Sequence, residues 1–168
     1  MEKLIVGKSL ETQLSALLAT LPSDAIVSYM VTRLNEGEEA TIVASSKETQ
    51  IHTGASMVKT LILEYVFHLA AQEQLDINDT IALSRSPRVE GAGALTELVG
   101  NHSFSYLELC RLMMVLSDNW ATNLLIQALG MEYINARAEQ IGLEHFEINR
   151  MMMDFKAVEE NRENYITA

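Results

Sequence analysis

The hydrophobic positions near the start of the chain repeat at helical spacing. Five leucines fall on one face of a helix, namely Leu10, Leu14, Leu17, Leu18 and Leu21. Pro22 follows them and predicts the end of this helix, because proline does not continue a helix. Two runs rich in β-branched residues come next, at 25–34 and 40–44, and the polar stretch 35–38 between them suits a turn. We therefore expect a helix followed by a strand hairpin.

Residues 57–72 are apolar on nearly every side of a helix. A helix of this kind belongs in the centre of a domain and not on its surface. Ser56 stands at its N-terminus, where the positive end of the helix dipole favours a developing negative charge. The pattern thus predicts a buried helix with a serine at its start.

The second half of the chain is mainly helical in its pattern, after a turn-rich stretch at 73–101. Ser105 and Glu108 have the spacing of a capping box, which starts a helix. Gly130 and Gly142 each follow a helical stretch and predict its end. The expected helices are 94–98, 105–116, 120–129, 132–141 and, weakly, 155–163.

Length and charge exclude several classes of partner. The 168 residues suit one domain, which we divide into 1–54, with the first helix and hairpin, and 55–168, the helical part. The net charge of -11 argues against binding to nucleic acid or to an anionic membrane surface. No apolar run approaches the roughly 18 residues of a membrane span, and the start does not resemble a signal peptide. As written, the chain is expected to be cytoplasmic.

Cysteine and histidine offer no metal site in the sequence. Cys110 is the single cysteine and lies in an apolar helical stretch, so we expect a buried structural thiol. The histidines have no metal-ligand spacing: His52, His68, His102 and His145. We expect no metal and no cofactor.

Two short motifs suggest chemistry. Ser56 and Lys59 are three residues apart at a helix start, so they share one face of the first turn and can exchange a proton. The second motif, residues 117–119 with the sequence Ser-Asp-Asn, falls in a short loop between two helices. Without further context Lys59 could be a surface lysine, Ser56 a helix cap and residues 117–119 a connecting turn.

Together, the motifs resemble those of the penicillin-recognising serine hydrolases, and most of all their class A β-lactamase-like branch. Segments 91–95, 116–125 and 149–154 are also typical of that group. The resemblance implies an α/β (α+β) fold like that of serine β-lactamases and penicillin-binding proteins. In it, a helical domain holding the nucleophile packs against an antiparallel sheet, of which this chain has the first two strands.

The resemblance also implies a role for each motif residue. Ser56 would attack a β-lactam or a D-alanyl peptide and form an acyl-enzyme, and Lys59 would take or relay its proton. Ser117 would pass a proton to the leaving nitrogen. Asn119 would bind the amide of the substrate's side chain. The backbone N–H of Ser56 would supply half of an oxyanion hole.

The family's third motif, Lys-Thr-Gly on a later strand, does not occur in the sequence. We therefore expect an N-terminal portion of the domain, without its C-terminal strands, that is weakly active or inactive alone. Open sheet edges would favour a homodimer or a complementing segment. Members of this family usually act in the periplasm or outside the cell.

A further departure concerns hydrolysis of the acyl-enzyme. Class A β-lactamases place a glutamate where this chain has Met152, and a thioether cannot activate water. Glu159, Glu160 and Glu163 follow closely, so a shifted loop could still supply a carboxylate. Three hypotheses stay open: an acyl-transfer hydrolase, a penicillin-binding or sensor module without turnover, and an inert fragment.

Overall fold

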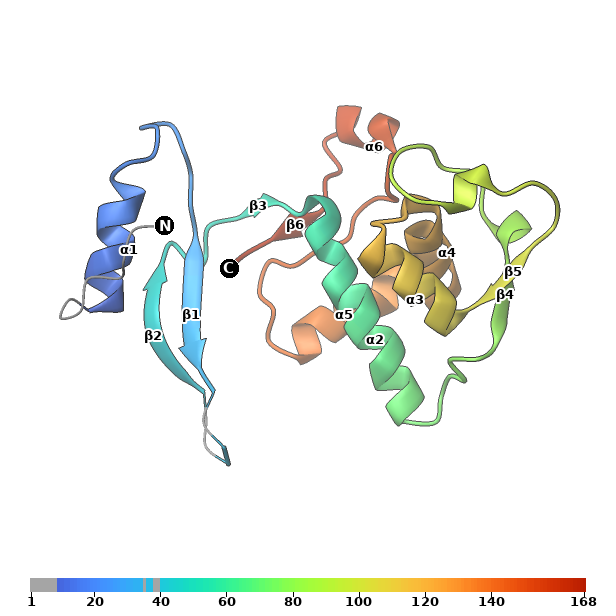
Figure 1. Ribbon diagram of the computed structural model, residues 1–168, viewed down its shortest axis with the longest axis horizontal. Helices are drawn as coiled ribbons and strands as arrows, with labels where there is room; N and C mark the ends of the chain where they lie inside the picture. Colours follow the sequence, from blue (N-terminus) through green and yellow to red (C-terminus); the bar gives the residue numbers. More distant parts are fainter. Residues whose placement is uncertain (1–8, 35, 38–39) are drawn as a thin grey trace. The chain divides into compact units, whose positions relative to one another are not determined.

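The computed structural model describes residues 9–34, 36–37 and 40–168 (Figure 1). They fall into two compact units, and each is described by itself. The first unit comprises the residues up to 50 together with 167–168, and the second comprises residues 51–166.

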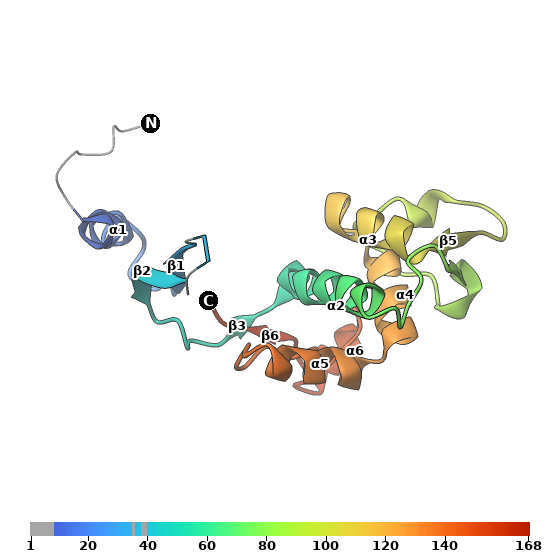
Figure 2. The same ribbon diagram turned by 90° about the horizontal axis from the view of Figure 1, so that it is seen from below.

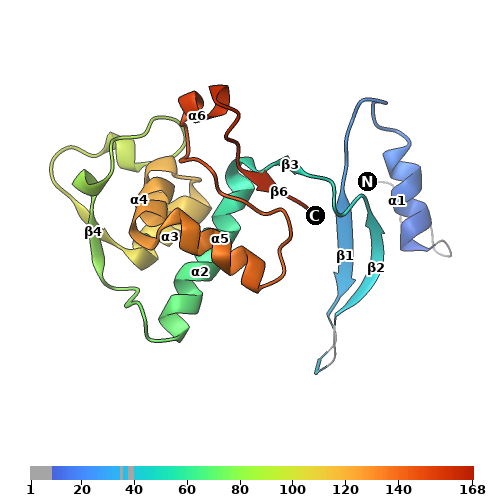
Figure 3. The same ribbon diagram turned by 180° about the vertical axis from the view of Figure 1, so that it is seen from behind.

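The first unit contains the predicted helix and hairpin. Helix α1 (Leu10–Leu18) lies against β2 (Thr41–Ser46), which pairs antiparallel with β1 (Tyr29–Arg33). Figure 3 shows this unit from behind. The helix ends before the last leucine of the predicted pattern. The Thr20 hydroxyl donates to the Leu17 carbonyl there, and turns replace the last part of the expected helix. The predicted turn at 35–38 lies partly outside the described residues.

The second unit is built around α2 (Lys59–Ala71), which follows a short 3₁₀ turn (Ala55–Val58). Helix α2 packs against the three helices that come next in the chain. The helix is central to this unit, as predicted, but only one of its faces is fully buried. Its buried face carries Leu61, Ile62 and Val66, whereas Phe67 is 45% exposed. The described helices pack against the buried face, so apolar side chains elsewhere on α2 remain partly accessible.

The remaining helices follow the sequence pattern closely. The Ser105 capping box is present, and Gly130 and Gly142 take positive φ values of 86° and 80° after their helices. Asp118 caps the N-terminus of the central helix, which therefore starts at Asn119, one residue earlier than predicted. The helices are α3 (Tyr106–Val115), α4 (Asn119–Leu129), α5 (Met131–Gln140) and α6 (Phe155–Glu159), with short 3₁₀ turns at Leu83–Arg85 and Leu95–Glu97.

Two small antiparallel pairs are absent from the sequence prediction. Strand β3 (His52–Thr53) pairs with β6 (Tyr165–Ile166), and β4 (Thr80–Ala82) pairs with β5 (Ser103–Ser105). Figure 2 shows β3 and β6 side by side just before α2 begins. The β3–β6 pair joins the end of the chain to the segment that leads into Ser56.

The core of the second unit lies between α2, α3, α4 and α5. Cys110 is buried in it, as predicted, and burial raises the pKa of its thiol to about 11. The described residues include no helix that is both long and apolar enough to cross a membrane.

Candidate active site

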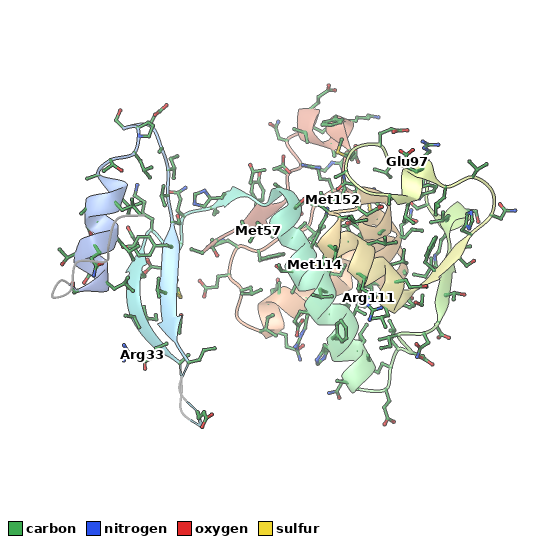
Figure 4. All side chains as sticks on the ribbon, in the orientation of Figure 1. Arg33, Met57, Glu97, Arg111, Met114 and Met152 are labelled. Atoms are coloured by element: carbon green, nitrogen blue, oxygen red, sulfur yellow. The ribbon has the colours of Figure 1, made fainter. Side chains whose placement is uncertain are left out.

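The two sequence motifs meet in the structure. Ser56 lies in the 3₁₀ turn before α2, and Ser117 lies in the short link between α3 and α4. The Ser56 and Ser117 hydroxyl oxygens are 3.1 Å apart, and Lys59 Nζ donates to the Ser117 hydroxyl at 2.8 Å. Ser117 therefore lies between the serine and the lysine of the first motif. Figure 4 labels Met57, which follows Ser56 in the 3₁₀ turn that leads into α2.

Lys59 is a buried residue and not a surface lysine, with only 2% of it exposed. Its ammonium group donates to the Ser117 carbonyl at 2.8 Å and to Asn119 Oδ1 at 3.1 Å, besides the Ser117 hydroxyl. Burial lowers the pKa of Lys59, and the nearby Asp118 carboxylate partly opposes this shift. A lowered pKa increases the fraction of neutral amine, which is the form that can accept a proton.

Asp118 holds the loop of the second motif by hydrogen bonds to the backbone. Its carboxylate accepts from the N–H groups of Ala94 at 2.7 Å, Leu95 at 2.9 Å and Ala121 at 2.9 Å. Gly93 passes so close that a Cβ there would be 2.3 Å from the carboxylate. Asp118 thereby joins the 91–95 segment to the start of α4.

A residue with strained backbone lies next to the first motif, and another lies within the second. Ala55 and Ser117 have positive φ values of 42° and 52°, in the left-handed region that side chains disfavour. Such residues cost on the order of 1–3 kcal/mol each and persist only where their surroundings fix them. Ala55 directly precedes Ser56, so the direction of the Ser56 side chain depends on that strained turn.

Met152 is clamped by Asn123, a residue that the sequence analysis did not single out. The Met152 N–H donates to Asn123 Oδ1 at 2.8 Å, and Asn123 Nδ2 donates to the Met152 carbonyl at 3.1 Å. Of the nearby glutamates, Glu163 is ion-paired with Arg150 and Glu160 with Arg162. Asn123 could have been suspected from its position one helical turn after Asn119, on a buried helix.

Known proteins resemble this chain over most of its length. A profile of the beta-lactamase enzyme family matches residues 9–168. The chain belongs to that family. One curated member, beta-lactamase BRO-1 of Moraxella catarrhalis, is 29% identical over 110 residues, which are 61% of this chain and 35% of that protein.

Several solved structures share the fold of this chain. A single-residue mutant of PBP-A, solved as an acyl-enzyme complex with penicillin G, is 25% identical with a TM-score of 0.75, over 94% of this chain and 56% of that chain. The ancestral GNCA class A beta-lactamase is 22% identical with a TM-score of 0.75, over 95% and 59%. The beta-lactamase of Sphaerobacter thermophilus is 24% identical with a TM-score of 0.66, over 82% and 51%.

Two statements follow from these matches. The predicted α/β fold of serine β-lactamases is confirmed. The chain spans about half the length of these structures, and about a third of the curated relative.

Within the described ranges, no group of three or more histidine, cysteine, aspartate or glutamate side chains is placed to hold a metal ion.

Proposed function

We propose that this protein is a serine hydrolase of β-lactams or D-alanyl peptides that forms an acyl-enzyme on Ser56. The observation that carries the proposal is the hydrogen-bonded series from Ser56 Oγ to Ser117 Oγ at 3.1 Å and on to Lys59 Nζ at 2.8 Å. A serine hydroxyl needs a nearby base to become a good nucleophile, and a buried lysine with a lowered pKa can be that base.

In the proposed acylation, proton transfer runs first from Ser56 through Ser117 to Lys59, and then back from Lys59 through Ser117 to the leaving group. Ser56 Oγ bonds to the substrate carbonyl carbon, its proton passes to Ser117, and the Ser117 proton passes to neutral Lys59. When the carbon–nitrogen bond breaks, Ser117 gives a proton to the leaving nitrogen and takes one back from Lys59. The net transfer is one proton from Ser56 to the leaving group, and Lys59 ends neutral.

Asn119 is the proposed substrate-binding residue. Its Oδ1 accepts from Lys59 at 3.1 Å, which fixes the orientation of the carboxamide. Its Nδ2–H group is then the one that donates to the amide carbonyl of the substrate's side chain. The backbone N–H of Ser56, at the start of a helix, would bind the developing oxyanion.

We further propose that the described chain is weakly active alone. It spans 51–59% of the three solved structures described above, so groups that those proteins use can lie outside it. Loss of a single oxyanion donor can reduce kcat about 10²- to 10³-fold.

A second candidate, a penicillin-binding protein without turnover, is favoured by Met152. Asn123 holds this residue by two hydrogen bonds, and its side chain has no group that can activate water. Glu163, the half-buried glutamate of the same loop, is bound to Arg150. An acyl-enzyme formed on Ser56 would then persist.

Labelling with a fluorescent penicillin tests the proposal. The wild-type chain should be labelled covalently, and Ser56→Ala should not. Ser103→Ala, which removes an exposed serine hydroxyl elsewhere, serves as the control and should be labelled like the wild type. Equal labelling of Ser56→Ala would contradict the proposal. A chromogenic cephalosporin then separates the two candidates, because only the hydrolase turns over more than one equivalent.

A further inference from the structure

Asn164 closes the loop that contains Met152. The residue is buried, with only 1% of it exposed. Its Oδ1 accepts from the N–H groups of Asn149 at 2.8 Å and Arg150 at 3.0 Å, and its Nδ2 donates to the Arg150 carbonyl at 3.2 Å. One carboxamide therefore joins the two ends of the segment 149–164.

The same residue also holds the segment that leads to Ser56. The Asn164 carbonyl accepts from the Gly54 N–H at 2.6 Å, and the Gly54 carbonyl accepts from the Met57 N–H at 2.9 Å. Between these two bonds stands Ala55, at its unfavourable φ of 42°. The bond from Gly54 to Asn164 is thus one of the contacts that keep the strained turn before Ser56 in place.

The position of Asn164 is itself fixed from several sides. Glu163 Oε1 accepts from the Asn164 N–H at 2.7 Å and is ion-paired with Arg150. A Cβ at Gly54 would be 2.7 Å from Val58 Cγ1 and 3.3 Å from the Asn164 carbonyl oxygen, so the two segments touch closely. Movement of the Asn164 backbone would consequently be transmitted to Gly54.

We propose that Asn164 is a positioning residue for Ser56, through which closure of the loop 149–164 fixes the turn that carries the nucleophile. The inference rests on the proposed function, in which Ser56 is acylated. Without its carboxamide bonds, the loop would open, the carbonyl would leave the Gly54 N–H, and Ala55 could relax. A displacement of about 1 Å at a reacting group can cost about 10²-fold in rate.

Asn164→Ala, Asn164→Asp and the matched control Asn135→Ala test this inference. Asn135 forms the same kind of clamp, with two hydrogen bonds of 2.9 Å to the backbone of Ile148, but it has no bond to Gly54. Asn164→Ala should reduce the rate of penicillin acylation about 10²-fold. Asn164→Asp keeps both acceptor bonds but replaces the donor to the Arg150 carbonyl by a carboxylate oxygen, so it should recover only part of the rate. Asn135→Ala should acylate at nearly the wild-type rate even if its stability falls.

Amide hydrogen exchange gives a second measurement that needs no activity. In the wild-type protein, the N–H groups of Gly54, Asn149 and Arg150 should open together, because Asn164 binds all three. Asn164→Ala should speed exchange at Gly54, and Asn135→Ala should not. Independent opening of Gly54 in the wild type, or wild-type acylation by a folded Asn164→Ala variant, would overturn the inference. If penicillin never acylated the wild-type protein, the proposed function would be refuted. Hydrogen exchange at Gly54 would then still test whether Asn164 holds the turn before Ser56.

Discussion

The hydroxyl of Ser117 lies 2.8 Å from the side-chain nitrogen of Lys59, although the two residues are 58 positions apart in the chain. The same hydroxyl is 3.1 Å from Ser56 Oγ. Within one motif the sequence places Ser56 and Lys59 near each other, but the described hydrogen bonds run through Ser117. The second motif therefore supplies the proposed route of the proton, and this arrangement leads to the predictions below.

Ser117→Ala removes the hydroxyl between Ser56 and Lys59. General acid–base catalysis contributes about 10²- to 10⁴-fold, so the acylation rate should fall by that order. The rate is measured as the appearance of covalent adduct after mixing with excess penicillin. Ser84→Ala, an exposed serine in the 3₁₀ turn after β4, should acylate like the wild type. An unchanged rate for Ser117→Ala would place proton transfer on a direct contact between Ser56 and Lys59.

The lowered pKa of Lys59 predicts how stability depends on pH. The unfolded chain binds a proton at Lys59 up to its ordinary pKa of 10.5, whereas the folded protein loses that proton at lower pH. Between the two pKa values the unfolded state holds more protons, so the free energy of unfolding should rise with pH there. Urea unfolding at a series of alkaline pH values measures this slope. Lys59→Met has no group that titrates at this position, so its free energy of unfolding should lack the rise with pH. The same rise in Lys59→Met and the wild type would contradict a lowered pKa of Lys59 as its cause.

Asp118→Ala should destabilise the protein by about 3 kcal/mol, because backbone N–H groups of Ala94, Leu95 and Ala121 lose a charged acceptor. Urea unfolding measures the change. Asp76→Ala removes an exposed carboxylate that accepts from the Asn78 N–H and should cost no more than about 1 kcal/mol. Equal losses of unfolding free energy in the two variants would show that the buried position of Asp118 does not increase its contribution to stability.

Sequence patterns predicted the parts of this fold that depend on local rules. The Ser105 capping box and the stops at Gly130 and Gly142 follow from short-range hydrogen bonding and from glycine's conformational freedom. The burial of Cys110 followed from the apolar stretch around it. These features need only a few neighbouring residues to specify them.

Other features depend on contacts between distant segments and had no comparable signal. The β3–β6 pair has two residues in each strand, and residues from distant parts of the chain meet in it, such as His52 and Ile166. Asn123 and Asn164 form hydrogen bonds to backbone groups. Because every residue has these groups, no sequence motif marks the partners. The strain at Ala55 appears only when the chain is folded, because alanine ordinarily favours helix or strand conformations.

Met152→Glu would place a carboxylate where the loop is clamped by Asn123. If Met152 is what prevents hydrolysis of the acyl-enzyme, the lifetime of the penicillin adduct should shorten about 10²-fold or more, as expected for a general base. Intact mass followed over time after removal of free penicillin measures this lifetime. Met152→Gln has a similar size but no base and should keep the long-lived adduct. A short lifetime in the wild type would already exclude the penicillin-binding candidate.

The β1–β2 hairpin predicts self-association. It is a two-stranded sheet in the described part of the chain, and Ile42 on β2 is 57% exposed. Unpaired strand edges with apolar side chains favour pairing with another copy or a complementing segment. Sedimentation velocity over a range of micromolar concentrations should show a dimer that Ile42→Lys weakens. A monomer at every concentration would contradict this prediction.

The most direct test of the account is the intact mass of the chain after incubation with a penicillin, followed by peptide mapping. We predict an adduct of one penicillin per chain, carried by the peptide that contains Ser56 and absent from Ser56→Ala. A folded wild-type chain that gains no mass, or an adduct on any other residue, would contradict the claim that Ser56 is a nucleophile activated through Ser117 and Lys59.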